Sequence, residues 1–264
     1  MNRTRHDVIQ ARERLWYPEP ARELLLQRLH DLATDPVRHR ARSIAIIGES
    51  NSGKSSIISR YLRQHPVQRE AGGLIVPAIS INMTHIGRVE DLSVRLLEEV
   101  QAADPGRGTH TERIKRFMKL ARQMQLGLIF LDEFHDSARD SKRGMQFLQL
   151  VKGLLLENHL VVPVGIESLA EVLSRDIQIN SRLNLTRGRL PRIEQPAVVK
   201  AMMVKLLGEA EVKDVAVEYV LRETRGVMGH ILDLIEGAVL EHGDLELASL
   251  RAVRADLDAL DLVV

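Results

Sequence analysis

Eight consecutive residues, 48–55, carry the most specific chemical pattern in this sequence. They read Gly-Glu-Ser-Asn-Ser-Gly-Lys-Ser and match Gly-x-x-x-x-Gly-Lys-[Ser/Thr]. In such a loop, glycines let successive backbone N–H groups turn toward phosphate oxygens, and the next helix adds its positive N-terminal end. Lys54 is expected to contact the terminal phosphates, and the Ser55 hydroxyl to bind Mg²⁺. The predicted nucleotide-binding residues, with ATP as the expected nucleotide, are Gly48, Glu49, Ser50, Asn51, Ser52, Gly53, Lys54, Ser55 and Ser56.

Two neighbouring carboxylates, Asp132 and Glu133, follow the apolar run 128–131. This position is the end of a buried strand, where Asp132 would bind the magnesium ion of the nucleotide through water. Glu133 would polarise a water molecule for attack on the terminal phosphate, as expected of a hydrolase rather than of a small-molecule kinase. The alternative is a helix N-cap at Asp132 beside a solvated Glu133. Together with the loop, the pair predicts catalysis by Glu133 and Lys54.

The elements that must position these residues alternate between strands and helices. Continuous apolar runs typical of buried parallel strands cover 43–47, 74–81, 126–131 and 160–164. Helical periodicity covers 55–64, 89–101, 111–125 and 141–157, and after Pro191 only helical patterns follow, at 195–207, 212–223, 228–241 and 247–260. We predict a three-layer α/β domain with a mainly parallel sheet and a small all-helical C-terminal lid. The predicted divisions are 1–42 (N-terminal extension and helix), 43–190 and 191–264.

The composition excludes several classes of protein. The 264 residues include no cysteine, which excludes disulfides and thiolate catalysis, and the ten histidines show no metal-ligand spacing. No apolar run approaches the roughly 18 residues of a membrane span, so a cytoplasmic protein is expected. Lys plus Arg (37) nearly balances Asp plus Glu (36), so any polyanion site must be local.

These motifs, together with the apolar run near Val161 and the helical C-terminal part, resemble those of AAA+ ATPases. More narrowly, the sequence resembles the TniB/TnsC family of transposition ATPases from about residue 14 to about residue 240. The residues that carry the resemblance are Tyr17-Pro18, Ile47 to Ser55, Phe130-Leu131-Asp132-Glu133-Phe134-His135, Val164-Gly165 and Ser181-Arg182. The resemblance implies a protein that oligomerises on duplex DNA as a ring or filament when ATP is bound. It also implies that the protein marks a target site, recruits or activates a transposase with a TniQ-like target-selection adaptor, and disassembles on hydrolysis.

The resemblance also implies residue roles around the nucleotide. Arg182 matches the arginine that a neighbouring subunit inserts toward the terminal phosphate, and its rivals are Arg175, Arg187 and Arg189. Tyr17 and Pro18 are candidates for packing on the adenine, or alternatively for anchoring the N-terminal helix.

Two departures from the family pattern bear on turnover. Ile166 stands where a polar residue usually helps to place the attacking water, so Glu167 or Ser168 would have to substitute. In the lid, Gly229 and His230 stand where many relatives carry arginine, which leaves His230 or Arg225 to contact the nucleotide. Slow hydrolysis is therefore expected.

A local basic stretch supplies the expected DNA contacts. Residues 104–122 hold six basic and two acidic side chains, with a hydroxyl-rich turn before the helix. The predicted contacts are Arg107, Thr109 and Thr111, with Arg88 or Arg95 on the preceding segment. The alternative for this stretch is a solvated helix face.

Two other functions fit the same motifs. One is another AAA+ DNA machine, such as a helicase loader or an initiator-like protein. The other is a nucleotide-gated scaffold with little turnover, because Ile166 and the altered lid could remove useful hydrolysis.

Overall fold

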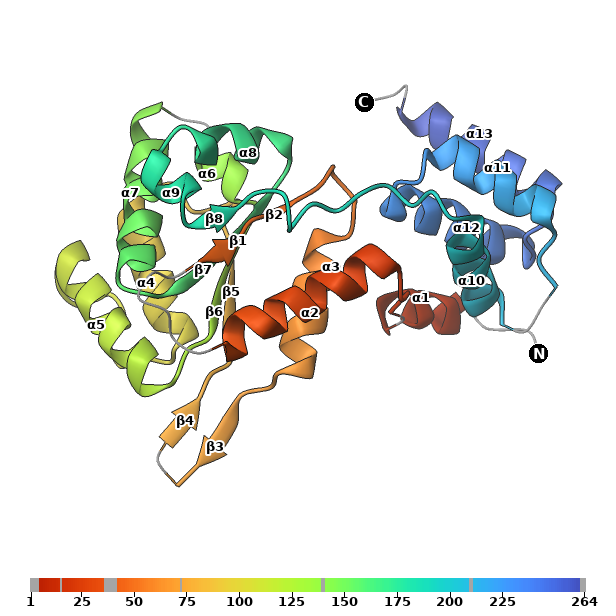
Figure 1. Cartoon of the computed structure of the whole chain (residues 1–264). Coiled ribbons are helices and arrows are strands. Elements are labelled where there is room, and N and C mark those ends of the chain that lie inside the picture. Colours follow the sequence, from red (N-terminus) through yellow and green to blue (C-terminus); the bar gives the residue numbers. More distant parts are fainter. Residues whose placement is uncertain are drawn as a thin grey trace. The chain divides into compact units, whose positions relative to one another are not determined.

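The computed structural model describes residues 5–14, 16–35, 42–71, 73–138, 141–208 and 211–261 (Figure 1). Contacts divide the chain into two units. The larger consists of Ala21–Ser50 and Lys54–Leu190, and the smaller of Met1–Pro20, Asn51–Gly53 and Pro191–Val264. The three-part division at residues 42 and 190 stays a prediction.

A parallel sheet forms the centre of the larger unit. Its strands are β1 (Ser43–Ile44), β2 (Ile46–Ile47), β5 (Ala78–Asn82), β6 (Leu128–Asp132), β7 (Leu160–Gly165) and β8 (Leu183–Asn184). The order is β2-β7-β6-β5, and β1 pairs with β8. Because only Ala45 separates β1 from β2, the extended segment 43–47 lies between β8 on one side and β7 on the other. The predicted parallel sheet is confirmed.

Helices cover both faces of this sheet. Successive side chains of a strand point to opposite faces, and in these strands the side chains on both faces are mostly apolar and buried. The helices of this unit are α2 (Pro20–Thr34), α3 (Lys54–Gln64), α4 (Val89–Glu99), α5 (His110–Gln123), α6 (Phe134–Ala138), α7 (Ser141–Leu156), α8 (Glu167–Ser174) and α9 (Ile177–Asn180). On β6, Ile129 and Leu131 belong to the hydrophobic cluster that includes α4, α5 and α7. Phe130, between them, packs edge-on against Tyr61 of α3, with ring centres 5.6 Å apart. The three layers are visible in Figure 1.

The predicted strand 74–81 was wrong in extent. Its first part is β4 (Gly73–Ile75), which pairs antiparallel with β3 (Gln68–Glu70) in a separate two-stranded sheet. Only the second part, β5, joins the parallel sheet. Pro77 lies between the two parts and has no N–H to donate to a ladder, which gives a physical reason for the break.

The smaller unit is helical, as predicted for the C-terminal part. It consists of α1 (Arg5–Arg14), α10 (Pro196–Leu207), α11 (Asp214–Thr224), α12 (Met228–His242) and α13 (Leu247–Asp261). Its separate hydrophobic core includes Val199, Met202, Ile231 and Leu250. Arg12 of α1, a helix that the sequence patterns did not predict, forms ion pairs with Asp233 and Glu236 of α12.

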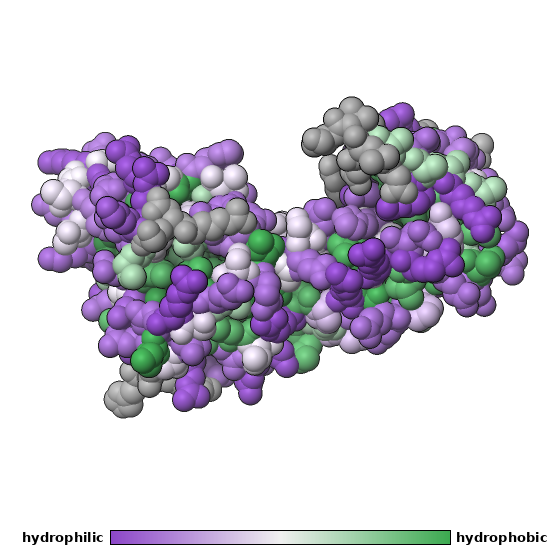
Figure 2. All heavy atoms as spheres, turned by 90° about the horizontal axis from the view of Figure 1, so that it is seen from above, coloured by the Kyte–Doolittle hydropathy of each residue, from purple (hydrophilic) through white to green (hydrophobic). Residues whose placement is uncertain are grey.

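The visible surface of both units is mostly hydrophilic, and hydrophobic residues are scattered over it (Figure 2). Within the described residues, every helix is too short or too polar to cross a membrane.

Candidate active site

The phosphate loop connects β2 to α3, as its pattern requires. Two residues of the loop have left-handed backbone angles, Asn51 with φ 59° and Gly53 with φ 88°. Glycine adopts this conformation without steric cost, which accounts for Gly53. The Gly48 N–H donates to the Gly165 carbonyl at 3.2 Å, which ties the start of the loop to the end of β7.

Lys54, at the first position of α3, is buried and points back into the loop. Its ammonium group donates to the carbonyl oxygens of Gly48 (3.1 Å) and Glu49 (2.8 Å). Burial lowers the pKa of Lys54, and the negative charges of Glu133 and Asp132 oppose that shift. A cation held by neutral carbonyls beside two carboxylates is suited to exchange those contacts for phosphate oxygens.

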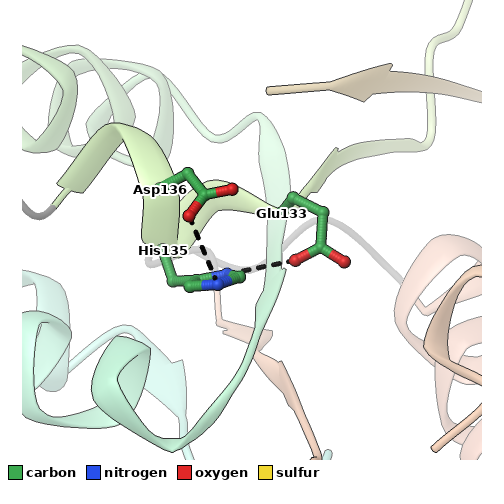
Figure 3. A group of neighbouring side chains, drawn as sticks. All are labelled: Glu133, His135 and Asp136. Carbon is green, nitrogen blue, oxygen red and sulfur yellow. Dashed lines mark ion pairs between the residues drawn. The ribbon is translucent and has the colours of Figure 1, made fainter. Parts of the chain in front are cut away.

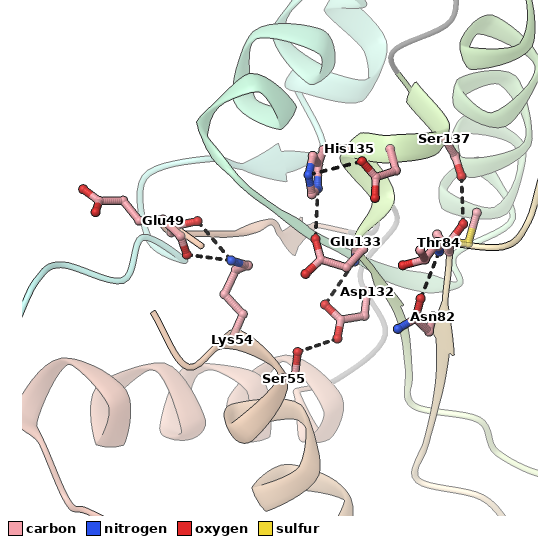
Figure 4. A network of polar contacts seen from close by, with 12 residues as sticks. Glu49, Lys54, Ser55, Asn82, Thr84, Asp132, Glu133, His135 and Ser137 are labelled. Carbon is pink, nitrogen blue, oxygen red and sulfur yellow. Dashed lines mark hydrogen bonds and ion pairs between the residues drawn. The ribbon is translucent and has the colours of Figure 1, made fainter. Parts of the chain in front are cut away.

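Ser55 and Asp132 meet from two elements that are distant in the sequence. The Ser55 hydroxyl donates to Asp132 Oδ2 at 2.8 Å, and Asp132 Oδ1 accepts the N–H of Glu133 at 3.0 Å (Figure 4). A hydroxyl and a carboxylate are hard oxygen ligands of the kind that Mg²⁺ prefers. The pair therefore fits the predicted magnesium site.

Glu133 follows the end of β6 in a left-handed conformation, with φ 54°. Such an angle is uncommon for a residue with a side chain, and it is found more often at functional sites than elsewhere. The carboxylate is 32% exposed, and one oxygen lies 3.1 Å from Nδ1 of His135 (Figure 3). His135 was not predicted to act in the site, although it stands in the motif that carries the acidic pair.

Of the candidates around Ile166, Glu167 is already paired. It follows β7, and its carboxylate accepts two hydrogen bonds from Arg189, each 2.7 Å long. These bonds lower the pKa of Glu167. Ser168 Oγ is buried and makes no hydrogen bond within the part of the chain that the structure describes. Ile166 itself is the N-cap residue of α8.

The arginine candidates lie at different ends of the sheet. Arg182 directly precedes β8, at the amino end of the strands, and donates to the Leu155 carbonyl at 3.4 Å. The phosphate loop follows β2, at the opposite, carboxyl end, so Arg182 cannot reach the loop of its own chain. Its rival Arg189 lies beside Ile47 at the carboxyl end and is paired with Glu167.

The other two rivals are exposed. Arg175 is the C-cap residue of α8. The backbone carbonyl of Arg187 accepts a hydrogen bond from Arg28 at 2.6 Å.

The adenine candidates belong to the smaller unit. Tyr17 is only 3% exposed and packs in the helical core, which favours the anchoring role, whereas Pro18 is exposed. His230 is exposed in the first turn of α12. The neighbouring Gly229 donates its N–H to the Asn51 carbonyl at 2.8 Å, and a Cβ there would lie 2.7 Å from Asn51 Cβ. An arginine at 229 would therefore displace Asn51.

Of the predicted DNA contacts, Arg88 and Thr109 are the N-cap residues of α4 and α5, Thr111 lies in the first turn of α5, and Arg107 lies in the turn before it. Thr109 caps α5 through a reciprocal pair of hydrogen bonds with Glu112, and Arg107, Thr109 and Thr111 are all exposed. Arg113 fixes the preceding turn by donating to Ser93 and to the Gly106 and Gly108 carbonyls.

The two arginines on the preceding segment differ in their charge environment. Arg88, the N-cap residue of α4, is 73% exposed and lies 3.5 Å from Asp91. Arg95 forms ion pairs with both Glu98 and Glu99, which offset its charge.

Comparison with solved structures places this fold among known proteins. The Aeropyrum pernix Orc1 protein, solved in complex with DNA, matches with TM-score 0.65 and 18% identity over 92% of this chain and 66% of that one, just under two thirds. Cdc6p from Pyrobaculum aerophilum matches with TM-score 0.63 and 14% identity, over 92% and 70% of the two chains. Domain III of the Thermotoga maritima replication initiation protein DnaA matches with TM-score 0.56 and 12% identity, over 91% and 94%. These matches confirm the predicted fold, an α/β domain with a mainly parallel sheet followed by a helical part.

Comparison by sequence is more specific. The family model described as "Bacterial TniB protein" matches residues 5–194. No curated protein sequence gives a significant match.

Proposed function

Because this chain belongs to the bacterial TniB family, we propose that it is an ATP-dependent, DNA-binding regulator of transposition. In this proposal, ATP-bound subunits oligomerise on DNA, mark a target site and recruit or activate a transposase. Hydrolysis then drives disassembly. A TniQ-like adaptor is the proposed source of target selection.

The observation that carries the proposal is the convergence of Lys54, Ser55, Asp132 and Glu133 at the carboxyl end of the sheet. The negative charges of Glu133 and Asp132 act to raise the pKa of Lys54, and the Ser55 hydroxyl donates a hydrogen bond to Asp132. When bound, Mg²⁺ neutralises phosphate charge; Ser55 and Asp132 are the residues that would hold it. Glu133 is then free to accept a proton from the attacking water.

Assembly is proposed to complete the site, because Arg182 lies at the amino end of the strands. An arginine at that position can act only on the nucleotide of a neighbouring subunit. Such an arginine neutralises the charge that develops on the transferred phosphoryl group, which would couple hydrolysis to oligomerisation.

The proposed DNA surface consists of the exposed side chains of Arg88, Arg107, Thr109 and Thr111. Two helix N-termini, those of α4 and α5, begin beside these residues and contribute backbone N–H groups and positive dipole ends. Few phosphate contacts per subunit predict weak, salt-sensitive binding by one subunit. Repetition along an oligomer would raise the total affinity.

Electron microscopy with duplex DNA and a slowly hydrolysed ATP analogue tests this function. Rings or filaments around DNA that require the analogue are expected for the wild-type chain. The Lys54→Ala chain should form none, because it lacks the phosphate-binding ammonium group. Assembly on DNA without nucleotide, or none with it, would contradict the proposal.

An initiator-like or helicase-loading role is a second candidate, favoured by the likeness in fold to the Orc1, Cdc6p and DnaA structures. Stimulation of a transposase by the assembled protein would separate the two roles. A scaffold with little turnover is a third, because Ile166 is apolar and Glu167 is held by Arg189. Single-turnover hydrolysis with and without duplex DNA distinguishes this scaffold from an ATPase.

A further inference from the structure

His135 lies between two carboxylates at the edge of the active site (Figures 3 and 4). Its Nδ1 atom is 3.1 Å from Glu133 Oε2, and its Nε2 atom is 3.5 Å from Asp136 Oδ1. Neither the phosphate loop nor the acidic pair explains a histidine at this position.

The imidazole ring of His135 packs against the end of β7. His135 is 7% exposed. A Cβ atom added to Gly165 would lie 3.0 Å from His135 Nδ1 and 3.1 Å from its Cβ, closer than ordinary contact distances. The ring therefore packs directly on the backbone of Gly165, and its position is set by the sheet.

The Nδ1 atom is a buried polar atom beside the predicted catalytic carboxylate. It makes no hydrogen bond within the described residues, although Glu133 Oε2 lies only 3.1 Å away. Leaving such an atom unsatisfied costs free energy. The Glu133 side chain is partly exposed and has three rotatable bonds, so it can turn to accept this bond while the ring stays fixed.

A shared metal ion is the other arrangement that these three side chains suggest, since their ligand atoms lie within 4.8 Å of one another. A histidine binds a metal ion through one nitrogen, in the plane of the ring. Here Glu133 lies beside Nδ1 of His135, whereas Asp136 lies beside Nε2. This placement fits a hydrogen bond from Nδ1 to Glu133 better than a common ion.

We propose that His135 is a positioning residue for Glu133. Its Nδ1–H donates to Oε2 and leaves Oε1 to accept the proton of the attacking water. Without this bond the carboxylate would sample several rotamers, and fewer of them would place it against the water. This inference rests on the proposed hydrolysis by Glu133, but the proposed hydrogen bond can be tested without turnover.

Three substitutions of His135 in the full chain distinguish a hydrogen-bonding role of the imidazole from a packing role. His135→Asn places an amide N–H near the position of Nδ1, His135→Gln places one near Nε2, and His135→Leu keeps volume without a donor. In single-turnover hydrolysis of Mg·ATP with duplex DNA, we expect the Leu and Gln chains to be slower by about 10- to 100-fold. The Asn chain should recover most of that loss, and ATP affinity should be unchanged in all three. Wild-type rates in the Leu chain, or an Asn chain no faster than the Gln chain, would overturn the proposal.

A measurement without turnover keeps this inference separate from the proposed function. In ¹⁵N-histidine spectra of the full chain, Glu133→Ala should shift the Nδ1 resonance of His135, while Glu157→Ala, at an exposed glutamate of the same unit, should not. An unshifted Nδ1 resonance refutes the contact even if the protein hydrolyses ATP. A wild-type chain that hydrolyses no ATP refutes the proposed function, and the spectra still decide the role of His135.

Discussion

At the scale of single residues, the proposed site assigns nucleotide binding and water activation to different residues. Lys54 and Ser55 begin α3 beside the predicted phosphate position, whereas Glu133 directly follows β6, where its backbone is left-handed. A residue held at such an angle is kept by its surroundings rather than by its own preference. Binding and hydrolysis should therefore respond to different substitutions.

Glu133→Gln should hydrolyse ATP at least about 100-fold more slowly, because an amide is a poor proton acceptor. ATP affinity should change little, since the contacts of Lys54 and Ser55 remain. Phosphate release and calorimetric titration check the two halves of this prediction. Long-lived assemblies on DNA should accompany the slow chain, and rapid phosphate release would exclude Glu133 as the catalytic carboxylate.

At the scale of elements, the turn before α5 is the part of the proposed DNA surface that hydrogen bonds hold in place. Thr109 and Glu112 form a capping box, and Arg116 donates to the Asp104 carbonyl at 2.7 Å. The hydrogen bonds from the N–H and hydroxyl of Thr109 lower the pKa of Glu112. Arg113 and Arg116 of α5 donate to backbone carbonyls of this turn and hold it in place, and Arg107 is exposed to solvent.

Thr109→Ala should lower the free energy of unfolding by about 1 kcal/mol, the usual cost of losing an N-cap. Thr109→Ser keeps the hydroxyl and should be close to the wild type. Denaturant unfolding of the three chains measures the difference. Equal stabilities would mean that the capping box contributes nothing to α5.

Arg107→Ala should weaken binding of the ATP-bound protein to duplex DNA. The slope of log K against log[salt] should become shallower by about 1 per subunit, the amount expected for one lost phosphate contact. Arg122→Ala removes the same charge from the last turn of α5, where Arg122 pairs with Glu157, and serves as the control. Fluorescence anisotropy over a range of salt concentrations compares the two. Equal losses would point to net charge rather than to a contact at Arg107.

At the scale of the whole molecule, the proposed nucleotide site and the proposed catalytic arginine of one chain lie at opposite ends of the sheet. The parallel sheet separates Arg182, before β8, from the loop after β2. The proposed catalytic site is therefore complete only between two copies of the chain.

Arg182→Ala should bind ATP normally but lose turnover by about 1,000-fold, in the range known for arginine fingers. Mixing it with Lys54→Ala chains provides the test, because each inactive chain keeps the part that the other lacks. Activity should return in the mixture and depend on the ratio of the two chains. A mixture as inactive as its components would remove the basis for action in trans.

The local sequence determined the phosphate loop, the acidic pair, the α/β fold class and the helical C-terminal part. Each is encoded within a short window, by glycine spacing, by hydrophobic period or by a carboxylate after an apolar run. The same reasoning extended the strand at 74–81 too far and did not predict α1 or β8, since neither has a strong local period.

Only the tertiary structure decided which distant residues meet. The register of β6 beside β7 brings His135 onto Gly165, and the course of the chain after β8 brings Arg189 to Glu167. Tyr17 likewise lies in the hydrophobic core of the smaller unit, among residues that are distant in the sequence. These contacts depend on strand register and helix packing over many residues, and a short window of sequence contains neither.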